Sequence, residues 1–143
     1  LYYGWLDETR NANAQGKPGA LVVTRDNRAL TSEAYAEIDH ALSRALHAVG
    51  SVQGSYAERN IEEHFPIAGT QKRHFAGVNP RVGLRYDVAD DAQVFGNISR
   101  SFEPPTLAEL SAGNVPGFSD LDAQTATTAE IGMRGRWRDI AWD

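Results

Sequence analysis

The sequence predicts an all-β fold, namely a segment of about seven strands from a larger antiparallel transmembrane β-barrel. Three observations lead to this prediction. Several stretches alternate apolar and polar residues with the period of two that a strand requires. No run approaches the roughly 18 apolar residues of a membrane-spanning helix, whereas barrel strands need only about 10 alternating residues. The predicted connections alternate between long and short, as in barrels with long external loops and short periplasmic turns.

The composition narrows the possible classes of protein. The 143 residues suffice for one domain, and 41% of them are hydrophobic, which is enough for an ordinary core if the chain folds alone. A formal net charge of −5 gives no basic footprint, so we expect no nucleic-acid partner. The chain has no cysteine, which excludes disulfides and thiolate metal sites.

The two ends of the sequence indicate a piece of a longer protein. The chain begins at Leu1 without an initiator methionine or a signal peptide. It stops at Asp143 just after residues 140–142 begin a strand-like pattern. We therefore expect residues 1–143 to be part of a barrel domain whose remaining strands lie outside this chain.

The first 28 residues predict a strand followed by a long loop. Residues 1–10 are rich in aromatic side chains, which favours a strand. The polar stretch that follows contains Gly16 and Pro18, and this composition favours an irregular loop. We expect that loop to cover residues 11–28.

The segment Thr31–Val49 has two interpretations. Its apolar residues fall at three- and four-residue steps and Ser32 could cap a helix, so an amphipathic helix fits the pattern. Two strands separated by a turn at residues 42–45 fit it as well. The local sequence leaves both interpretations open.

The middle of the chain predicts a strand and a second long loop. Gly50 and Gly54 would weaken a helix but suit a curved sheet, so residues 46–61 favour a strand. Residues 62–74 contain Pro66, Gly69 and several charged side chains. This composition predicts a loop.

The clearest element is a hairpin within Asn79–Leu110. Apolar and polar positions alternate on both sides of Asp90 and Asp91, which suit a tight turn. Pro104 and Pro105 cannot donate ladder hydrogen bonds, so the second strand must end there. One face of this hairpin is expected to be apolar: Val82, Leu84, Tyr86, Val88, Val94, Gly96 and Ile98.

The last third predicts a third long loop, a strand and a turn. The loop is expected over Leu107–Asp122, and Thr106 and Glu109 at its start form a capping-box pattern for one short helical turn. Residues 124–137 alternate again and indicate a strand. Arg138 and Asp139 are expected to form the next tight turn.

Three segments together resemble the β-barrel domain of TonB-dependent outer-membrane receptors. They are NPRVGLRYD at residues 79–87, FGNISRSFEPPTLAEL at residues 95–110 and QTATTAEIGMRG at residues 124–135. The family often has Glu where Gln124 stands and an aromatic residue where Ala129 stands. A looser similarity extends over Leu30–Phe65, and it favours two strands, Leu30–Ala41 and Leu46–Ile61, over the helix.

The resemblance implies a bacterial outer-membrane receptor with 22 strands around an N-terminal plug domain. Such a receptor has outer-membrane lipid and the TonB complex as partners, and TonB acts through an N-terminal region that this chain lacks. The plug domain, the TonB box and the C-terminal strand are therefore expected outside residues 1–143. The implied function is TonB-coupled uptake of a scarce nutrient, in the first place a ferric siderophore, although haem, cobalamin and carbohydrate receptors share these motifs.

No pattern in the sequence predicts catalysis, a resident metal or a cofactor. The four histidines His40, His47, His64 and His74 have no tight ligand spacing. Nucleophile elbows, phosphate loops and paired acid–base signatures are also lacking from the sequence. We therefore expect binding and gated passage, without bond chemistry.

Ligand contact is expected from external loops and the upper inner wall. Arginine and aromatic side chains recognise anionic or catecholate chelates through charge and stacking. The residues predicted to bind ligand are His64, Phe65, Arg73, His74, Arg100 and Phe118.

Two other classes of protein share the strand pattern. One is a soluble all-β binding module of the lipocalin-like kind, which predicts closed ends with both termini satisfied. The other is a passive diffusion porin, which predicts a barrel without a plug. The sequence upstream of this chain would distinguish the porin from the receptor.

Overall fold

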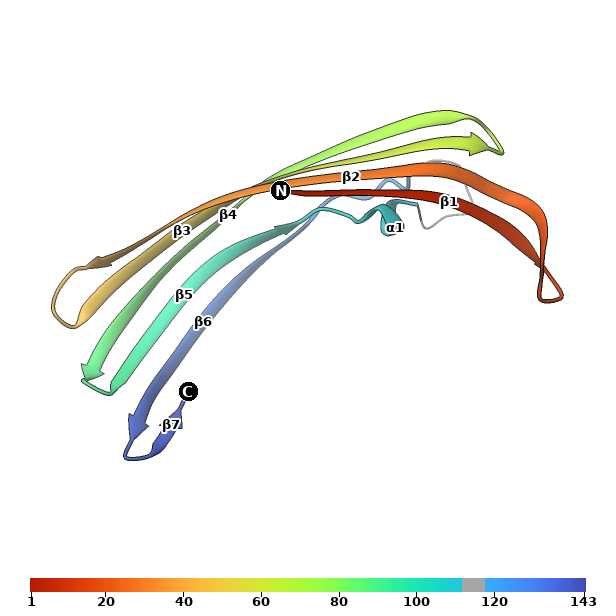
Figure 1. The fold of residues 1–143 in the computed structure, drawn as a ribbon. Coiled ribbons are helices and arrows are strands. Elements are labelled where there is room, and N and C mark those ends of the chain that lie inside the picture. The colour runs from red at the N-terminus through yellow and green to blue at the C-terminus, as the bar shows by residue number, and fades with distance from the viewer. Residues whose placement is uncertain (112–117) are drawn as a thin grey trace. The chain divides into compact units, whose positions relative to one another are not determined.

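The fold was taken from a computed structural model that describes residues 1–111 and 118–143, with only the backbone of Trp137. Seven strands form one sheet in sequence order, and the pairs whose register is resolved are antiparallel (Figure 1). The all-β prediction of about seven strands is confirmed. The elements are β1 (Tyr2–Ala14), β2 (Lys17–Ala41), β3 (Leu46–Phe65), β4 (Gly69–Ala89), β5 (Ala92–Glu103), α1 (Leu107–Leu110), β6 (Gln124–Trp137) and β7 (Ile140–Trp142).

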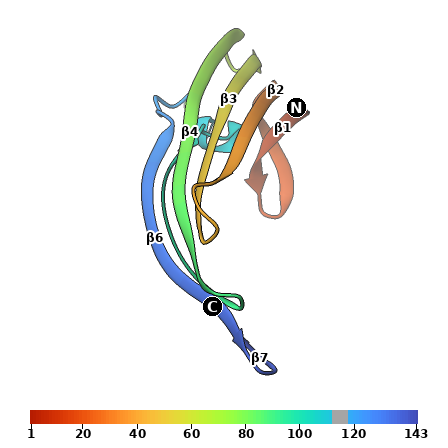
Figure 2. The ribbon, with the colours of Figure 1, turned by 90° about the vertical axis from the view of Figure 1, so that its left-hand side faces the viewer.

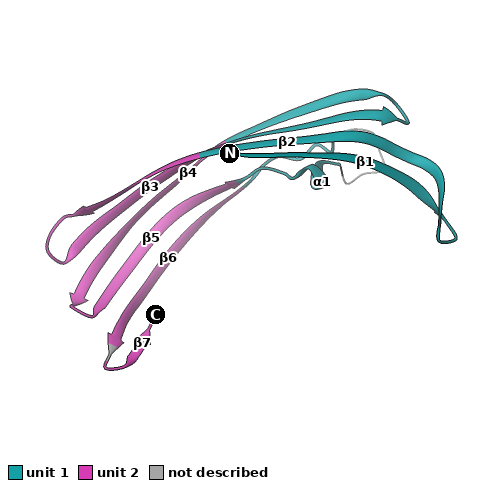
Figure 3. Cartoon of the chain, viewed as in Figure 1, with its two compact units in different colours: residues 1–33, 56–76, 103–124 teal, residues 34–55, 77–102, 125–143 magenta. Residues whose placement is uncertain are grey.

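The chain divides into two compact units (Figure 3). Unit 1 comprises residues 1–33, 56–76 and 103–124, and unit 2 comprises residues 34–55, 77–102 and 125–143. Strands β2, β3 and β4 contribute to both units. Within the described residues, no helix is long and apolar enough to cross a lipid bilayer.

The predicted loop over residues 11–28 is wrong, because these residues form a hairpin. Strand β1 ends at Ala14 and β2 begins at Lys17. Gln15 and Gly16 have φ angles of 54° and 83°, and two positive φ angles are typical of the two-residue turns that join antiparallel strands. The side chain of Asn13 accepts a hydrogen bond from the Gly16 amide at 2.8 Å. The polar composition belongs to strand residues that pair along the whole hairpin.

The predicted loop over residues 62–74 is also wrong. Strand β3 continues to Phe65 and β4 starts at Gly69, so only three residues connect them. Four charged or ionisable side chains of this stretch, His64, Lys72, Arg73 and His74, pair with residues from other parts of the chain. Lys72 Nζ lies 2.8 Å from Glu58 Oε1, and lateral pairs of this kind stabilise a polar sheet surface.

The predicted alternation of long and short connections is therefore wrong, because the first two predicted long loops are turns of two and three residues. The other element predictions agree with the structure. The segment Thr31–Val49 forms strands on both sides of a turn at residues 42–45, as the family resemblance favours. The hairpin turn at Asp90 and Asp91 is present, and Leu84 pairs with Gly96 across it. The third long connection lies between β5 and β6, although its residues 112–117 are outside the described part. Strand β7 turns back along the end of β6 through residues 138–139 (Figure 2).

Candidate functional site

The buried part of the described chain lies almost entirely in unit 1. All five buried apolar residues belong to this unit: Val23, Ala57, Ile61, Phe75 and Leu110. A sheet face becomes buried only when something covers it. In unit 1 the cover comes from the connection after β5, and we call residues 104–111 and 118–121 the strap.

One arginine fastens the strap to the sheet of unit 1. Arg59 on β3 is only 7% exposed, and its Nε donates to the carbonyl of Pro105 at 3.1 Å. Its Nη1 donates to the Leu30 carbonyl at 3.0 Å and to Thr31 Oγ1 at 3.2 Å on β2. Hydrogen bonds from a charged group are stronger than neutral ones. Arg59 therefore joins β2, β3 and the strap at one point.

A second set of contacts holds the later part of the strap against β4. Arg73 Nη1 lies 3.1 Å from Asp120 Oδ1, and its Nη2 donates to the Leu121 carbonyl at 3.3 Å. The Phe118 amide donates to Gln71 Oε1 at 2.6 Å. The guanidinium of Arg73 also lies 5.8 Å from the ring centre of Phe75, within the range of a cation–π interaction.

The strap begins with a capped helical turn. The amide of Glu109 donates to Thr106 Oγ1 at 3.2 Å, while the amide and hydroxyl of Thr106 donate to the Glu109 carboxylate at 2.8 Å each. This confirms the capping box predicted for these two residues. The hydrogen bonds from Thr106, its backbone amide first, lower the pKa of Glu109, because they favour the charged carboxylate.

Charged and amide side chains are buried beside the apolar residues of unit 1. Arg25 on β2 pairs with Glu8 on β1, with Nη2 to Oε2 at 2.6 Å. The amide nitrogen of Asn27 donates to the same carboxylate at 3.4 Å. Glu63 on β3 is also buried. The covered face of unit 1 is therefore rich in polar groups, which a binding surface for a polar ligand requires.

The sheet of unit 2 has one polar face whose charges pair laterally. His47 Nδ1 lies 3.1 Å from Asp39 Oδ1, and Arg85 Nη1 lies 3.7 Å from Asp39 Oδ2. The amide of Asn97 donates to Glu130 Oε2 at 2.9 Å. These residues alternate with apolar positions on the same strands, as the sequence predicts.

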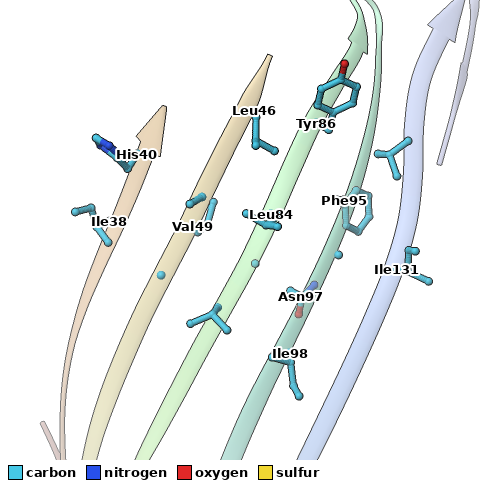
Figure 4. A pocket seen from close by; sticks show the side chains of 16 residues that line it. Ile38, His40, Leu46, Val49, Leu84, Tyr86, Phe95, Asn97, Ile98 and Ile131 are labelled. Atoms are coloured by element: carbon cyan, nitrogen blue, oxygen red, sulfur yellow. The ribbon is translucent and has the colours of Figure 1, made fainter. Parts of the chain in front are cut away.

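The other face of unit 2 carries an apolar hollow of about 860 Å³. The register places Leu84 opposite Gly96 and Val82 opposite Ile98. Gly50, Gly83 and Gly96, which carry no side chain, are among the residues that line the hollow. The side chains around it come from β2 to β6 (Figure 4) and include Ile38, His40, Leu46, Val49, Leu84, Tyr86, Ile98 and Ile131.

The structure brings two of the six predicted ligand residues together. Arg73 and Phe118 both lie where the strap meets β4, through Asp120 and Gln71. Successive strand residues point to opposite faces, so His74 lies on the other face of β4 from Arg73.

The other four predicted residues lie elsewhere. His74 Nδ1 is 2.8 Å from the Tyr56 hydroxyl, and His64 Nε2 is 3.4 Å from Asp26 Oδ2. Phe65 is exposed at the end of β3, and Arg100 is exposed on β5 in unit 2. A role in ligand binding stays a prediction for all six.

Arg59 and Arg25 were missed in the sequence because their hydrogen-bond and ion-pair partners lie far from them along the chain. Arg59 donates to backbone carbonyls, which leave no mark on residue identity. The one signal in the sequence is that Arg59 lies between Ala57 and Ile61 at alternate positions of a strand. Residues at alternate positions share one face, so these two apolar neighbours predict a buried position for Arg59. The described residues contain no group of three or more His, Asp or Glu side chains that could hold a metal ion.

Comparison with known proteins identifies the family of the chain. The model of the family described as "TonB dependent receptor-like, beta-barrel" matches residues 1–143. No curated protein matches the sequence. The family match covers all the strands, the strap and the covered face described above. The chain therefore belongs to the TonB-dependent receptor-like β-barrel family.

Proposed function

We propose that this chain forms part of the wall of an outer-membrane receptor that imports a ferric siderophore with energy supplied through TonB. The role in outer-membrane transport follows from the family, which is a bacterial outer-membrane transporter family and not an enzyme family. The cargo and the roles of individual residues are the proposal. A plug domain and a TonB box elsewhere in the same protein complete the proposed receptor.

The observation that supports this cargo is the composition of the covered face of unit 1. Arg73 is half-buried beside the ring of Phe75, which is a pairing suited to an anionic, aromatic chelate. The partner of Arg73 is Asp120, whose side chain is 97% exposed. An exposed ion pair contributes little stability, so a ligand anion can replace Asp120 at small cost.

Unit 2 supports the membrane part of the proposal. Its apolar hollow is bordered by aliphatic side chains and Tyr86, which suit lipid acyl chains, while its opposite face carries paired charges that suit a hydrated interior. A barrel wall needs these two faces on the same strands. A lipocalin-like carrier would instead turn its apolar face inward toward the ligand.

Uptake of radioactive iron in the bacterium that encodes the chain tests the proposal. Deleting the gene should abolish uptake of at least one ferric hydroxamate or catecholate chelate under iron limitation, and loss of TonB should do the same. In the complemented strain, Arg73→Ala should reduce uptake, whereas Lys72→Ala, one position away on the opposite face, should not. Unchanged iron uptake after gene deletion would contradict the proposal, and uptake that persists without TonB would favour a porin.

A further inference from the structure

One end of the apolar hollow in unit 2 carries basic side chains. His40, Leu46 and Tyr86 lie toward the end of the hollow where β2 and β4 finish and β3 begins (Figure 4). Arg44 is exposed in the turn of residues 42–45 that joins β2 to β3. His40 is exposed as well. The hollow therefore combines a mainly apolar lining with a basic end.

The turn that carries Arg44 is held beside β4 by backbone hydrogen bonds. The Ala45 amide donates to Ser43 Oγ at 3.3 Å within the turn. The Asp87 amide on β4 donates to the Ala45 carbonyl at 2.8 Å. Because Tyr86 directly precedes Asp87 along β4, Tyr86 and Arg44 belong to the same end of the sheet.

The carboxylates closest to this end along the strands pair on the opposite face of the sheet. Asp39 Oδ1 lies 3.1 Å from His47 Nδ1, and Asp87 Oδ1 lies 3.6 Å from Arg85 Nε. Alternate strand residues share one face, so these pairs lie on the face away from the hollow. In the described part of the chain, Arg44 has no ion pair with a carboxylate. Its charge is therefore open to an anion from outside the chain.

The turns of unit 2 differ in charge. Residues 42–45 join β2 to β3, residues 90–91 join β4 to β5, and residues 138–139 join β6 to β7. Of these three turns, only the first has a basic residue without an acidic one, since the second is Asp90-Asp91 and the third is Arg138-Asp139. An anion is therefore favoured at the β2–β3 turn and disfavoured at the next turn.

The size of the hollow and the chemistry of its basic end select one kind of ligand. At about 30 Å³ for each small group, the volume of about 860 Å³ has room for about thirty methylene groups, which is comparable with the acyl chains of one lipid. The guanidinium of arginine matches the oxygens of a phosphate group. Imidazole and phenol groups can donate further hydrogen bonds.

We infer that this hollow binds one molecule of an anionic phospholipid, with the acyl chains in the hollow and the phosphate beside Arg44. His40 and Tyr86 supply donors at the same end. The inference deepens the proposed function and rests on the part of it in which this face of unit 2 meets lipid. A barrel contacts lipid along its whole apolar band. At this hollow, one lipid is held more tightly than its neighbours and is selected by its charge.

Native mass spectrometry of the purified full-length receptor tests the selection by charge. The receptor, stripped of lipid, is titrated with dimyristoyl phosphatidylglycerol or with phosphatidylcholine of the same acyl chains. The first phosphatidylglycerol should bind about fivefold more tightly, the value of one basic residue beside an anionic lipid. Arg44→Gln should remove this preference. Arg81→Gln is the matched control and should keep it, since Arg81 is an exposed arginine on the opposite face of β4.

A second pair of variants tests the hollow itself. Gly50 lines the hollow and Gly54 does not, although both lie on the same face of β3. A methyl group at Gly50 would lie 3.5 Å from Ile38 Cγ2, an ordinary contact, and one at Gly54 would contact nothing within 4 Å. Gly50→Leu should fill the hollow and remove the tight binding of the first phosphatidylglycerol, whereas Gly54→Leu should leave it.

Several outcomes would overturn the inference. They are equal affinity of the wild-type receptor for the two lipids, an unchanged preference in Arg44→Gln, an equal loss in Arg81→Gln, or tight binding that persists in folded Gly50→Leu. Arg44 is exposed in a turn, so its variant tests the site even if Gly50→Leu does not fold.

The lipid site and the cargo can fail separately. TonB-dependent iron uptake by a receptor without this lipid preference would refute the lipid site alone. Arg44-dependent binding of phosphatidylglycerol, with iron uptake unchanged after gene deletion, would refute the cargo alone.

Discussion

Replacing Arg59 by Leu should loosen the strap without unfolding the sheet. Among the four acceptors of Arg59, the Pro105 carbonyl is the one that belongs to the strap. A hydrogen bond from a charged donor contributes about 1.5–3 kcal/mol. The free energy of opening the strap should fall by this amount, which raises the open population by about 10- to 150-fold.

Hydrogen exchange of the full-length receptor in detergent measures this opening. The amides of Leu110 and Ser111 report it, because they donate to the carbonyls of Thr106 and Leu107 within α1. Their protection should fall about 10- to 150-fold in Arg59→Leu. Arg28→Leu serves as the matched control, since Arg28 is an exposed arginine of the same unit. Protection within twofold of wild type in Arg59→Leu would refute the anchoring role.

Two further predictions concern packing and pH. A methyl group at Gly77 would overlap the ring of Phe102, so Gly77→Ala should lower the free energy of unfolding by about 1–3 kcal/mol. In the double variant, Phe102→Ala should remove most of the penalty of Gly77→Ala. An equal penalty with and without the ring would contradict this packing. The pKa of Glu109 is lowered from 4.5, so the charged cap stabilises α1 fully above about pH 4.5 and is lost as the pH falls through the lowered pKa. The hydrogen-exchange rate of the α1 amides, corrected for intrinsic rates, should therefore rise at low pH in the wild-type protein. In Glu109→Gln this rate should depend less on pH. The same pH dependence in both proteins would contradict the role of Glu109 in the cap.

The fold could be predicted where one face of a strand is apolar and the other polar. The hairpin around Asp90 and Asp91 has this pattern, and its register places Val82 opposite Ile98 as expected. Residues 17–28 and 62–74 carry polar groups on both faces, so the alternation disappears and their composition resembles that of a loop. Their strands depend on partners across the sheet, which no local pattern records.

The candidate site could be predicted only in part. Arginine and aromatic chemistry pointed to Arg73 and Phe118, and the strap brings both to the same edge of β4. The same chemistry also selected His64 and His74, because residue type alone does not tell on which face a side chain lies. Arg59 could not be found in this way, since three of its four acceptors are backbone carbonyls, which leave no mark on residue identity.

The most direct test of the account is whether the two faces of unit 2 meet lipid and water. Spin labels are placed one at a time along β4 in the full-length receptor, which is reconstituted in lipid bilayers. Each label reports its contact with two probes: oxygen, which partitions into lipid, and a nickel chelate, which stays in water. Labels at Val82, Leu84 and Tyr86 should respond to oxygen, whereas labels at Arg81 and Arg85 should respond to nickel. The same response at successive residues, or the reverse alternation, would contradict a barrel wall.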